Sequence, residues 1–486
     1  MTTDVPPSSL AAPIENRILG KGLLTALVVG SMIGAGVFSL PQNIAAKAGP
    51  LAILIGWGIT GVGMLALALV YQSLSMRKPA LNSGPYAYAR AGFGDFVGFN
   101  SAWGYWLSAW IGNVSYAVVL FGALSYFLPM FGEGNTWQAI LGASAVLWLI
   151  HFLILGGIRT AAITNLITTI AKIAPIVLFI ALMLLAFRLD VFTADFSGLA
   201  KPELGGILAQ VKSTMLVTLW VFIGVEGASV VSGRAKNRRD VGFATMAGFL
   251  ICLALYAAVS LLSLGIISQA ELAGMKNPSM AGVLEKVVGP WGAVLINLAL
   301  VVSVLGAFLS WTLIAAEIPF VVAREGMMPQ LFARENAAGS PSGSLWITNG
   351  LVQIVLIVTY FANSTYQALF SIASVAILVP YVLSGAFALK IALARDGYGL
   401  DEGSGRDILK GLIATLYGCW LVYAADTKYL FLCAMLYALG VFVFFWARQQ
   451  RGERVFTSLE GLLAAGLVLA GAGAAWLAFT GAIKLT

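Results

Sequence analysis

Two stretches of the sequence combine glycines with groups that could bind charge inside apolar segments. GSMIGAGVF spans residues 30–38 and WVFIGVEGAS spans residues 220–229. Glycine weakens a helix, and a helix that unwinds offers free N–H groups to an anion and free carbonyls to a cation. An amino acid carries both charges on one carbon. We therefore expect the break at 34–36 to receive a carboxylate and the break at 223–227 to receive an α-ammonium.

The first motif has a second interpretation when it is taken alone. Gly30 and Gly34 have the small-xxx-small spacing of closely packed membrane helices. The motif is not a dinucleotide or phosphate-binding loop, because it lacks GxGxxG and GK[ST] and follows no strand. A second glycine-interrupted segment five segments later favours a pair of broken helices. Gly30 keeps the packing role, whereas Gly34 and Gly36 are assigned to a binding site.

If the apolar segments cross a membrane, two ionisable residues lie inside it. Charge is costly at that depth and is associated with function. Glu226 is either a buried, uncharged acid that only packs, or a proton-linked gate or counter-charge for a cationic substrate. Lys172, beside Pro175, is either a structural replacement for a bound cation or a group that changes protonation during a cycle. Both interpretations of Lys172 make a sodium ion at that place unexpected. Glu317 is interpreted as an end-of-helix residue or an ion-pair partner, and His151 receives no role.

Aromatic and polar side chains extend the candidate site. Trp220 and Trp311 lie within apolar segments beside small or polar residues, and a tryptophan face is a good cation–π partner for an ammonium or guanidinium. Steps of four, four and three residues place one set on a single helical face; it consists of Tyr105, Ala109, Asn113 and Tyr116. Asn113 needs a hydrogen-bond partner at that depth, from a neighbouring helix or from a ligand.

The elements that must position these residues are membrane-spanning helices. The chain has 486 residues, of which 60% are hydrophobic and only 10% charged, whereas soluble domains are about 25% charged. Windows long enough to cross the hydrocarbon core predict thirteen spans. They cover residues 23–45, 50–74, 96–128, 137–156, 163–187, 206–231, 241–267, 289–321, 345–362, 366–392, 408–425, 429–447 and 459–480.

Charge distribution predicts the orientation of these spans. Apart from Lys172, most of the 28 lysines and arginines lie on the same side of the predicted membrane as the amino terminus. The positive-inside rule therefore favours a cytoplasmic amino terminus, and an odd number of spans then places the carboxyl terminus outside. The net charge of +7 reflects this topology, so no nucleic-acid partner is expected. The first residues form no cleavable signal peptide, and the three cysteines predict neither a disulfide framework nor a metal site.

Several motifs in order resemble one known family. They are GSMIGAGVFSLP (30–41), NSGPYAYAR (82–90), YWLSAWIGN (105–113), TLWVFIGVEGASVVSGRAKNRRDVG (218–242) and AREGMMPQLFAREN (323–336). Together they resemble the amino acid–polyamine–organocation superfamily. Within it, the chain resembles the bacterial basic amino acid/polyamine antiporters over roughly residues 15–450.

The resemblance implies a fold that the glycine breaks predict independently. It is an all-α polytopic membrane protein with five-plus-five inverted repeats and discontinuous first and sixth spans. We expect a cytoplasmic tail at 1–22, a transport core at 23–392 with repeats 23–187 and 206–392, two further helices at 408–447, and a thirteenth helix or re-entrant segment at 459–480. An extra span is associated with the arginine/ornithine exchangers of this family.

The resemblance also implies roles for individual residues. Ser31, Gly34, Ala35 and Gly36 would meet the substrate carboxylate, with Ile33 beside them. Trp220, Ile223 and Glu226 match the motif around the α-amino group and the proximal gate, and Trp311 matches the tryptophan that packs on the cationic side chain. Tyr105 matches an outer gating aromatic. The remaining substrate-binding positions are Ala109, Asn113 and Ser374. Lys172 resembles the lysine that fills the sodium site in proton-coupled relatives.

The function implied is exchange of cationic amino acids across the bacterial inner membrane, with arginine for ornithine as the leading pair. No enzyme activity, cofactor or metal is expected; the expected partners are small cationic amino acids, membrane lipid and, as in similar proteins, a second copy in a homodimer. The alternatives are proton-coupled uptake through Lys172 or Glu226, exchange of another pair (lysine/cadaverine, putrescine/ornithine or arginine/agmatine), and an amino acid sensor that does not transport.

Overall fold

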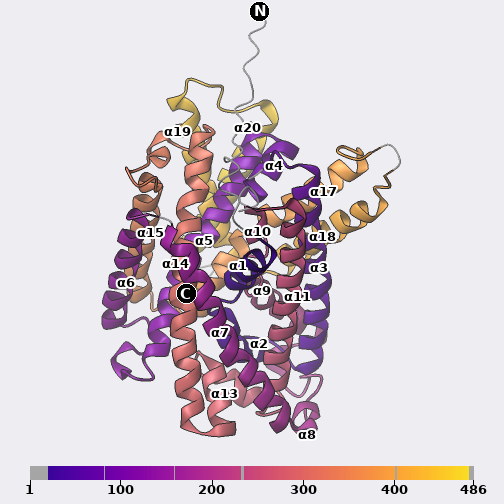
Figure 1. Ribbon diagram of the computed structural model, residues 1–486, viewed down its shortest axis with the longest axis vertical. Coiled ribbons are helices and arrows are strands. Elements are labelled where there is room, and N and C mark those ends of the chain that lie inside the picture. Colours follow the sequence, from indigo (N-terminus) through magenta and orange to yellow (C-terminus); the bar gives the residue numbers. More distant parts are fainter. Residues whose placement is uncertain (1–19, 82, 158, 231–234, 400–401, 481–486) are drawn as a thin grey trace, which may run out of the picture.

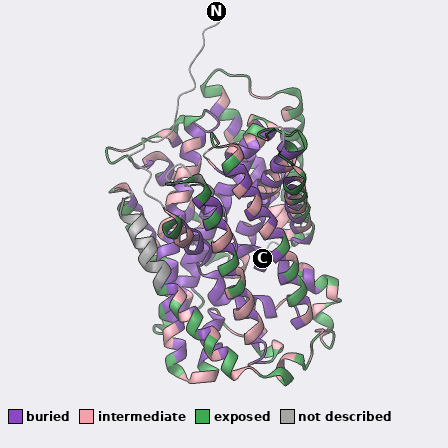
Figure 2. Cartoon of the chain, turned by 45° about the vertical axis from the view of Figure 1, so that its right-hand side comes forward, coloured by how far each residue is buried: buried purple, intermediate pink, exposed green. Residues whose placement is uncertain are grey.

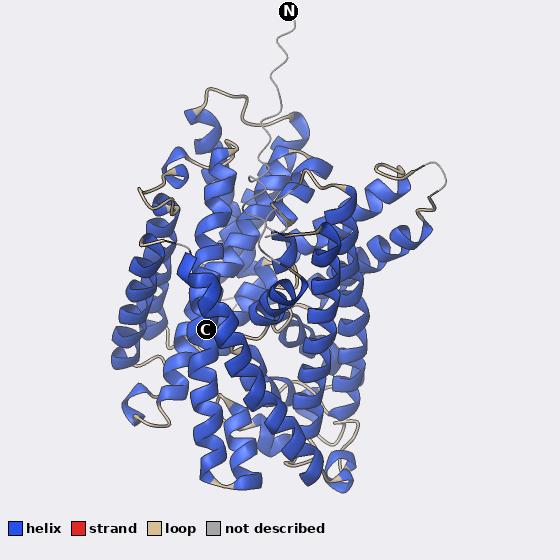
Figure 3. Ribbon diagram, viewed as in Figure 1, coloured by secondary structure: helices blue, strands red, loops and turns tan. Residues whose placement is uncertain are grey.

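The protein is built from helices joined mostly by short loops (Figure 3). The computed structural model describes residues 20–81, 83–157, 159–230, 235–399 and 402–480, and no β-strand occurs in these ranges. The predicted all-α class is therefore confirmed. Residues 1–19 of the predicted cytoplasmic tail lie outside the described ranges, and the first helix begins at Lys21.

The helices fall into two successive groups, each of which starts with a broken pair. The first group is α1 (Lys21–Met32), α2 (Gly36–Ala45), α3 (Pro50–Arg77), α5 (Asp95–Leu124), α6 (Trp137–Leu155) and α7 (Arg159–Ala186). The second is α9 (Ile207–Trp220), α10 (Gly227–Val230), α11 (Arg238–Ser263), α14 (Pro290–Arg324), α15 (Ser342–Phe361) and the consecutive helices α16 (Tyr366–Ala376) and α17 (Leu378–Leu393). The division into repeats at 23–187 and 206–392 stays a prediction.

Three long helices and several short ones complete the chain. The long ones are α18 (Gly405–Ala424), α19 (Thr427–Gln450) and α20 (Ser458–Phe479). The short ones are α4 (Pro85–Phe93), α8 (Leu189–Thr193), η2 (Pro129–Phe131), η3 (Pro202–Leu204), α12 (Gln269–Ala273), α13 (Ser279–Val288) and η5 (Gln330–Ala333). Figure 1 shows α4 and α20 near one end of the molecule and α8 and α13 at the opposite end.

The described helices are long and apolar enough for a multi-pass membrane protein. Ten of them could cross a membrane by length and composition, and the bent pair of α1 and α2 would make an eleventh. The described apolar stretches Ala171–Ala186 and Ile207–Trp220 are shorter, because side chains of α7 before residue 171 are not described and α9 stops at a break. Each of the thirteen predicted windows overlaps one of the described helices or consecutive helix pairs.

Burial separates a central helix from a peripheral one. In the most apolar part of α5, 89% of the residues are buried. In the corresponding part of α20, only 17% are buried. α5 packs against α14 and α16, while α1 packs against α11 and α7. Figure 2 shows buried residues concentrated in the interior and exposed residues at the surface and at both ends. α5 and α1 therefore hold their side chains where a buried site can form, and α20 packs on the outside against α19.

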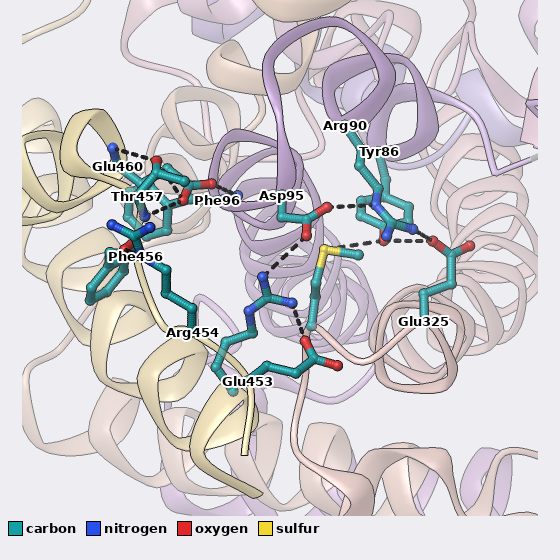
Figure 4. A network of polar contacts seen from close by, with 12 residues as sticks. Tyr86, Arg90, Asp95, Phe96, Glu325, Glu453, Arg454, Phe456, Thr457 and Glu460 are labelled. Carbon is teal, nitrogen blue, oxygen red and sulfur yellow. Dashed lines mark hydrogen bonds and ion pairs between the residues drawn. The ribbon is translucent and has the colours of Figure 1, made fainter. Parts of the chain in front are cut away.

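A network of ion pairs joins the helix ends near α4 (Figure 4). Asp95, at the start of α5, lies 2.9 Å from the Arg90 guanidinium and 3.3 Å from that of Arg448. Arg90 also pairs with Glu325, and Arg448 with Glu453. In this network each charged group therefore contacts one of opposite sign. We refer to these five residues as the rim network.

Two further contacts extend the rim network. Glu325 accepts a hydrogen bond of 2.8 Å from the Tyr86 hydroxyl. Burial, together with the negative charge of Glu325, raises the pKa of Tyr86, so that it stays a donor. α20 begins with a capping box between Thr457 and Glu460, and a Glu460 oxygen accepts the Phe96 N–H at 3.1 Å. These contacts attach α4 to the end of α14 and α20 to the start of α5.

Candidate substrate-binding site

The first break, between α1 and α2, depends on close approach to its glycines. The two helices meet at an angle of 43°. A Cβ atom on Gly34 would lie 2.7 Å from the Tyr116 hydroxyl oxygen, and one on Gly36 would lie 2.8 Å from Val221 Cγ1. Both distances are shorter than real Cβ contacts. Other segments of the chain pass next to the break, and Gly34 and Gly36 leave room for them. The two glycines also make unwinding of the helix easier, as expected from the sequence.

Carbonyl groups at the end of α1 are held by two side chains from other helices. The Lys172 ammonium of α7, fully buried, donates to Gly30 O at 2.6 Å and to Ile33 O at 2.5 Å. The Ser303 hydroxyl of α14 approaches the same region, at 3.1 Å from Gly34 O and 3.4 Å from Ile33 O. A lysine at this place supplies the positive charge that these carbonyls could otherwise obtain from a bound metal ion.

The N–H groups at the start of α2 have a different environment. Ala35 and Gly36 begin the helix, and the first N–H groups of any helix lack intrahelical acceptors. Among the described residues no acceptor is found for the N–H groups of Ala35, Gly36 and Val37. The positive end of α2 is therefore available to an anionic group such as a carboxylate.

The second break lies directly against the first. α9 ends at Trp220 and α10 starts at Gly227, and the backbone between them forms tight turns. Gly224 has φ of +108°, a conformation that L side chains rarely adopt, and a Cβ there would lie 3.0 Å from the Ser31 backbone. The Ser31 hydroxyl donates to Gly224 O at 2.9 Å. Ser31 thus ties the two breaks together.

Glu226 lies in the second break and is hydrogen-bonded only by neutral groups. Its carboxylate accepts from the Tyr105 hydroxyl at 2.7 Å and from the Tyr381 hydroxyl at 2.8 Å. The side chain is fully buried. Within the described residues no lysine or arginine comes close enough to form an ion pair with it. A cationic ligand would therefore find a carboxylate that has no competing protein cation.

A layer of aromatic residues surrounds Trp220. Its indole N–H donates to the Tyr366 hydroxyl at 3.0 Å, and its ring stacks on Phe370 with centroids 5.7 Å apart. Tyr116 packs on the same ring with centroids 5.8 Å apart. Tyr105 and Tyr116 are on one helix, eleven residues apart, and hence about 16 Å apart along its axis. We call Tyr116, Trp220, Tyr366 and Phe370 the tryptophan layer, and Tyr105, Glu226 and Tyr381 the glutamate layer.

Trp311 belongs to the region between these two layers. Its indole N–H lies 3.4 Å from Ser31 O, and its ring meets Tyr105 edge to face with centroids 6.4 Å apart. The tryptophan is therefore anchored to the first break by its polar edge. Its location beside both breaks is compatible with a ring face that contacts a cationic side chain.

Unpartnered polar atoms occur at the same depth. The Asn113 amide donates to Thr312 Oγ1 at 3.2 Å, but its carbonyl oxygen has no hydrogen-bond partner among the described residues. The same is true of the hydroxyls of Ser108 and Ser374. Buried polar atoms without partners are costly, so these atoms are candidates to bind a ligand. Ala109 and Ile223 are buried at this level and add apolar surface.

The structure brings most predicted site residues together and adds several that sequence analysis missed. Tyr381, Tyr366, Ser303 and Thr312 complete the contacts of Glu226, Trp220, the first break and Asn113. Each is a hydroxyl inside or at the end of an apolar helix, which is the one signal that could have marked it. His151 lies away from the site, next to Trp346 and Asn349.

This arrangement is suited to binding and release. Among the described residues no group of three or more histidine, cysteine, aspartate or glutamate side chains could hold a metal ion. The breaks instead present helix dipoles and two isolated charges, Lys172 and Glu226, deep inside a multi-pass helical protein. Two broken helices that meet at mid-depth are typical of secondary transporters with inverted repeats.

Comparisons with known proteins define the family. The amino acid permease family matches residues 23–464, and the chain belongs to this family. It is 51% identical to the arginine/ornithine antiporter of Pseudomonas aeruginosa over 478 residues, which cover 97% of this chain and 99% of that protein. It is 52% identical to a putative arginine/ornithine antiporter of Escherichia coli K12 over 94% of this chain and 98% of that protein. It is also 44% identical to the arginine/agmatine antiporter of Chlamydia pneumoniae, with coverage of 97% and 99%.

Proposed function

We propose that the protein exchanges arginine for ornithine across the bacterial inner membrane by alternating access. The observation that carries the proposal is the pair of adjacent breaks with an isolated carboxylate, Glu226, in one and free N–H groups in the other. The names of the full-length relatives support the choice of substrates. Exchange requires only that the loaded protein reorients readily and the empty one does not.

In this proposal each end of the substrate has its own contacts. The α-carboxylate binds the N–H groups of Ala35 and Gly36 near Ser31, and the α-ammonium binds carbonyls of the second break near Ile223. The cationic side chain lies on the face of Trp311, and Asn113, Ser374 and Ala109 complete its surroundings. Lys172 keeps the end of α1 unwound and occupies the place of a sodium ion.

The two layers are proposed to act as gates. With the predicted cytoplasmic amino terminus, the start of α5 is cytoplasmic. Tyr105 then lies on the cytoplasmic side of the site and Tyr116 on the outer side. The sequence-based role of Tyr105 as an outer aromatic is therefore revised: the glutamate layer forms the inner gate and the tryptophan layer the outer gate.

The proposed architecture keeps the predicted divisions. Residues 23–392 form the transport core with repeats 23–187 and 206–392, and residues 408–447 and 459–480 add helices at its periphery, the last of them a full thirteenth span. The carboxyl terminus then lies outside. Lipid surrounds the exposed apolar faces of the helices, and a homodimer is the proposed assembly.

Proteoliposomes test the function directly. Vesicles loaded with ornithine should take up labelled arginine at least about tenfold faster than empty vesicles, because the empty carrier does not return. Proton-coupled uptake is the second candidate, since the side chains found to bond Glu226 in the described part of the chain are two neutral tyrosines. The carboxyl group could then bind a proton in place of a cation. This second candidate predicts equal uptake into empty vesicles under an inward proton gradient. A protein that binds arginine without any flux would be a sensor.

A further inference from the structure

A cavity separate from the central site opens at the end of the molecule opposite to α4. Its volume is about 380 Å³, within the range of sites for small ligands. It lies between α2, the end of α5, the loop before α6, the loop between α12 and α13, and the start of α16. Its polar lining includes Gln42, Glu133, Lys276, Asn277, Tyr366 and Gln367. We call it the outer cavity.

The outer cavity contains one charge of each sign, and the two do not neutralise each other. Glu133 and Lys276 both line it, yet no ion pair joins them, and within the described residues neither is found in an ion pair with any other group. Both side chains are exposed. A carboxylate and an ammonium that face one cavity separately are complementary to a ligand that carries both charges, and an amino acid is such a ligand.

The segments that carry these charges are fixed to the transport helices. The Asn277 amide donates to Gln42 Oε1 at 3.3 Å and to Asn43 Oδ1 at 3.2 Å, and the Gln42 amide donates to Ala273 O at 3.1 Å. Gly134, next to Glu133, packs so closely on α5 that a Cβ would lie 1.8 Å from Val118 O. The cavity is therefore a built feature, and its two charges lie on loops that pack against α2 and α5.

Two buried polar atoms at the cavity are left without partners. They are Asn277 Oδ1, an acceptor, and Gln367 Nε2, a donor, and neither has a hydrogen bond among the described residues. Each belongs to a residue that lines the outer cavity. Both atoms are covered by protein, so a rotation of each amide is needed to turn them toward a ligand with ammonium and carboxylate groups.

The outer cavity ends at the tryptophan layer. Tyr366 lines the cavity and also accepts the hydrogen bond of the Trp220 indole. A ligand in the cavity is thus separated from the region of Trp311 by the tryptophan layer. When that layer opens, the cavity and the central site become parts of one path.

We propose that the outer cavity is a transit subsite that selects amino acids with a cationic side chain over the corresponding decarboxylated amines. Lys276 binds the α-carboxylate, which such amines lack, and repels a molecule that carries only positive charge. Glu133 binds a cationic group of either ligand. This inference rests on the proposed function, because it assigns to a transporter of cationic amino acids the step at which carboxylates are recognised before the central site.

The test uses the full-length protein in vesicles of defined orientation, with arginine outside and ornithine inside. Lys276→Gln should raise the external KM for arginine roughly threefold, as expected for an exposed charge contact. It should lower the inhibition constant of external agmatine by a similar factor, because the repulsive charge is gone. Glu133→Gln should instead weaken both ligands. The KM for internal ornithine and the maximal rate should stay as in the wild type.

Matched variants and opposite outcomes make the test decisive. Glu203→Gln removes an exposed charge and Lys428→Gln a half-buried one, both outside the outer cavity. Neither should change either constant, and Lys276→Arg should keep selection for the carboxylate. Equal shifts for arginine and agmatine in Lys276→Gln, or shifts no larger than those of the controls, would overturn the proposed subsite. Failure of the wild type to exchange arginine for ornithine would instead overturn the proposed function. Any other amino acid that it exchanges can then be compared with its own decarboxylated amine in the same variants.

Discussion

The central site and the rim network handle charge in opposite ways. At the rim, Asp95 contacts Arg90 and Arg448, and each arginine has a second carboxylate nearby. In the centre, Glu226 and Lys172 are fully buried, and their hydrogen-bond partners among the described residues are tyrosine hydroxyls and backbone groups. The rim charges are therefore neutralised within the protein, whereas the central ones are not.

This difference distinguishes structural charge from functional charge. Paired charges near the surface contribute little to stability and attach helix ends to one another. A buried charge without a counter-ion is costly and persists where it serves a function. The central carboxylate is therefore the group expected to respond to a cationic substrate, while the rim network is expected to respond mainly to unfolding.

The largest effect should come from a change to the backbone of the second break. Gly224→Ala places a Cβ at φ of +108° and 3.0 Å from the Ser31 backbone, which together should cost above about 3 kcal/mol. Arginine exchange should fall more than about a hundredfold in reconstituted vesicles. Gly350→Ala, in α15 with open space around it, is the matched control and should leave exchange unchanged. Normal exchange by the Gly224 variant would show that the break does not need this geometry.

A change to the isolated central charge should have the next largest effect. Glu226→Gln keeps the size of the side chain and removes its charge. The loss of a buried counter-charge should cost about 2 kcal/mol, so arginine affinity in a binding assay should fall about thirtyfold. Glu453→Gln removes a carboxylate of the rim network instead and should leave the affinity as it was. If both variants bind arginine like the wild type, Glu226 has only a packing role.

The cation–π contact should contribute less than the charge. Trp311→Leu removes the aromatic face beside the two breaks and should weaken arginine binding by about 0.5 to 2 kcal/mol. Trp476→Leu, on the exposed face of α20, provides a control tryptophan far from the site. Competition with labelled arginine measures both variants, and an unchanged affinity for Trp311→Leu would remove this residue from the site.

The smallest effect on transport should come from the rim network. Asp95→Asn breaks two ion pairs between partly exposed side chains, each worth about 0.2 to 1 kcal/mol. Thermal unfolding in detergent should shift down by a few degrees, while the affinity for arginine stays constant. A large loss of affinity with no change in unfolding would reverse the division between rim and centre.

Sequence alone was sufficient for the features that depend on local composition. The glycine pairs at 34–36 and 224–227 marked both breaks, because glycine in an apolar helix is conspicuous, and the lengths of the apolar windows located the helices. Glu226 and Lys172 were recognisable because ionisable residues are rare in such segments.

Features that depend on contacts between distant segments were not predictable in the same way. Tyr381 reaches Glu226 from a helix that starts about 150 residues later, and its sequence neighbourhood does not indicate that partner. The requirement for Gly34 comes from Tyr116, on another helix. The tryptophan layer likewise depends on contacts between α5, α9 and α16, which are far apart in the sequence.

Exchange of arginine for ornithine at the site between the two broken helices can be measured in a single experiment. Labelled arginine is supplied outside proteoliposomes that contain the wild-type protein and are loaded either with ornithine or with buffer alone. We expect rapid uptake into the ornithine-loaded vesicles and almost none into the empty ones, with no requirement for a proton gradient. Equal uptake into both kinds of vesicle would show that the protein does not work by exchange.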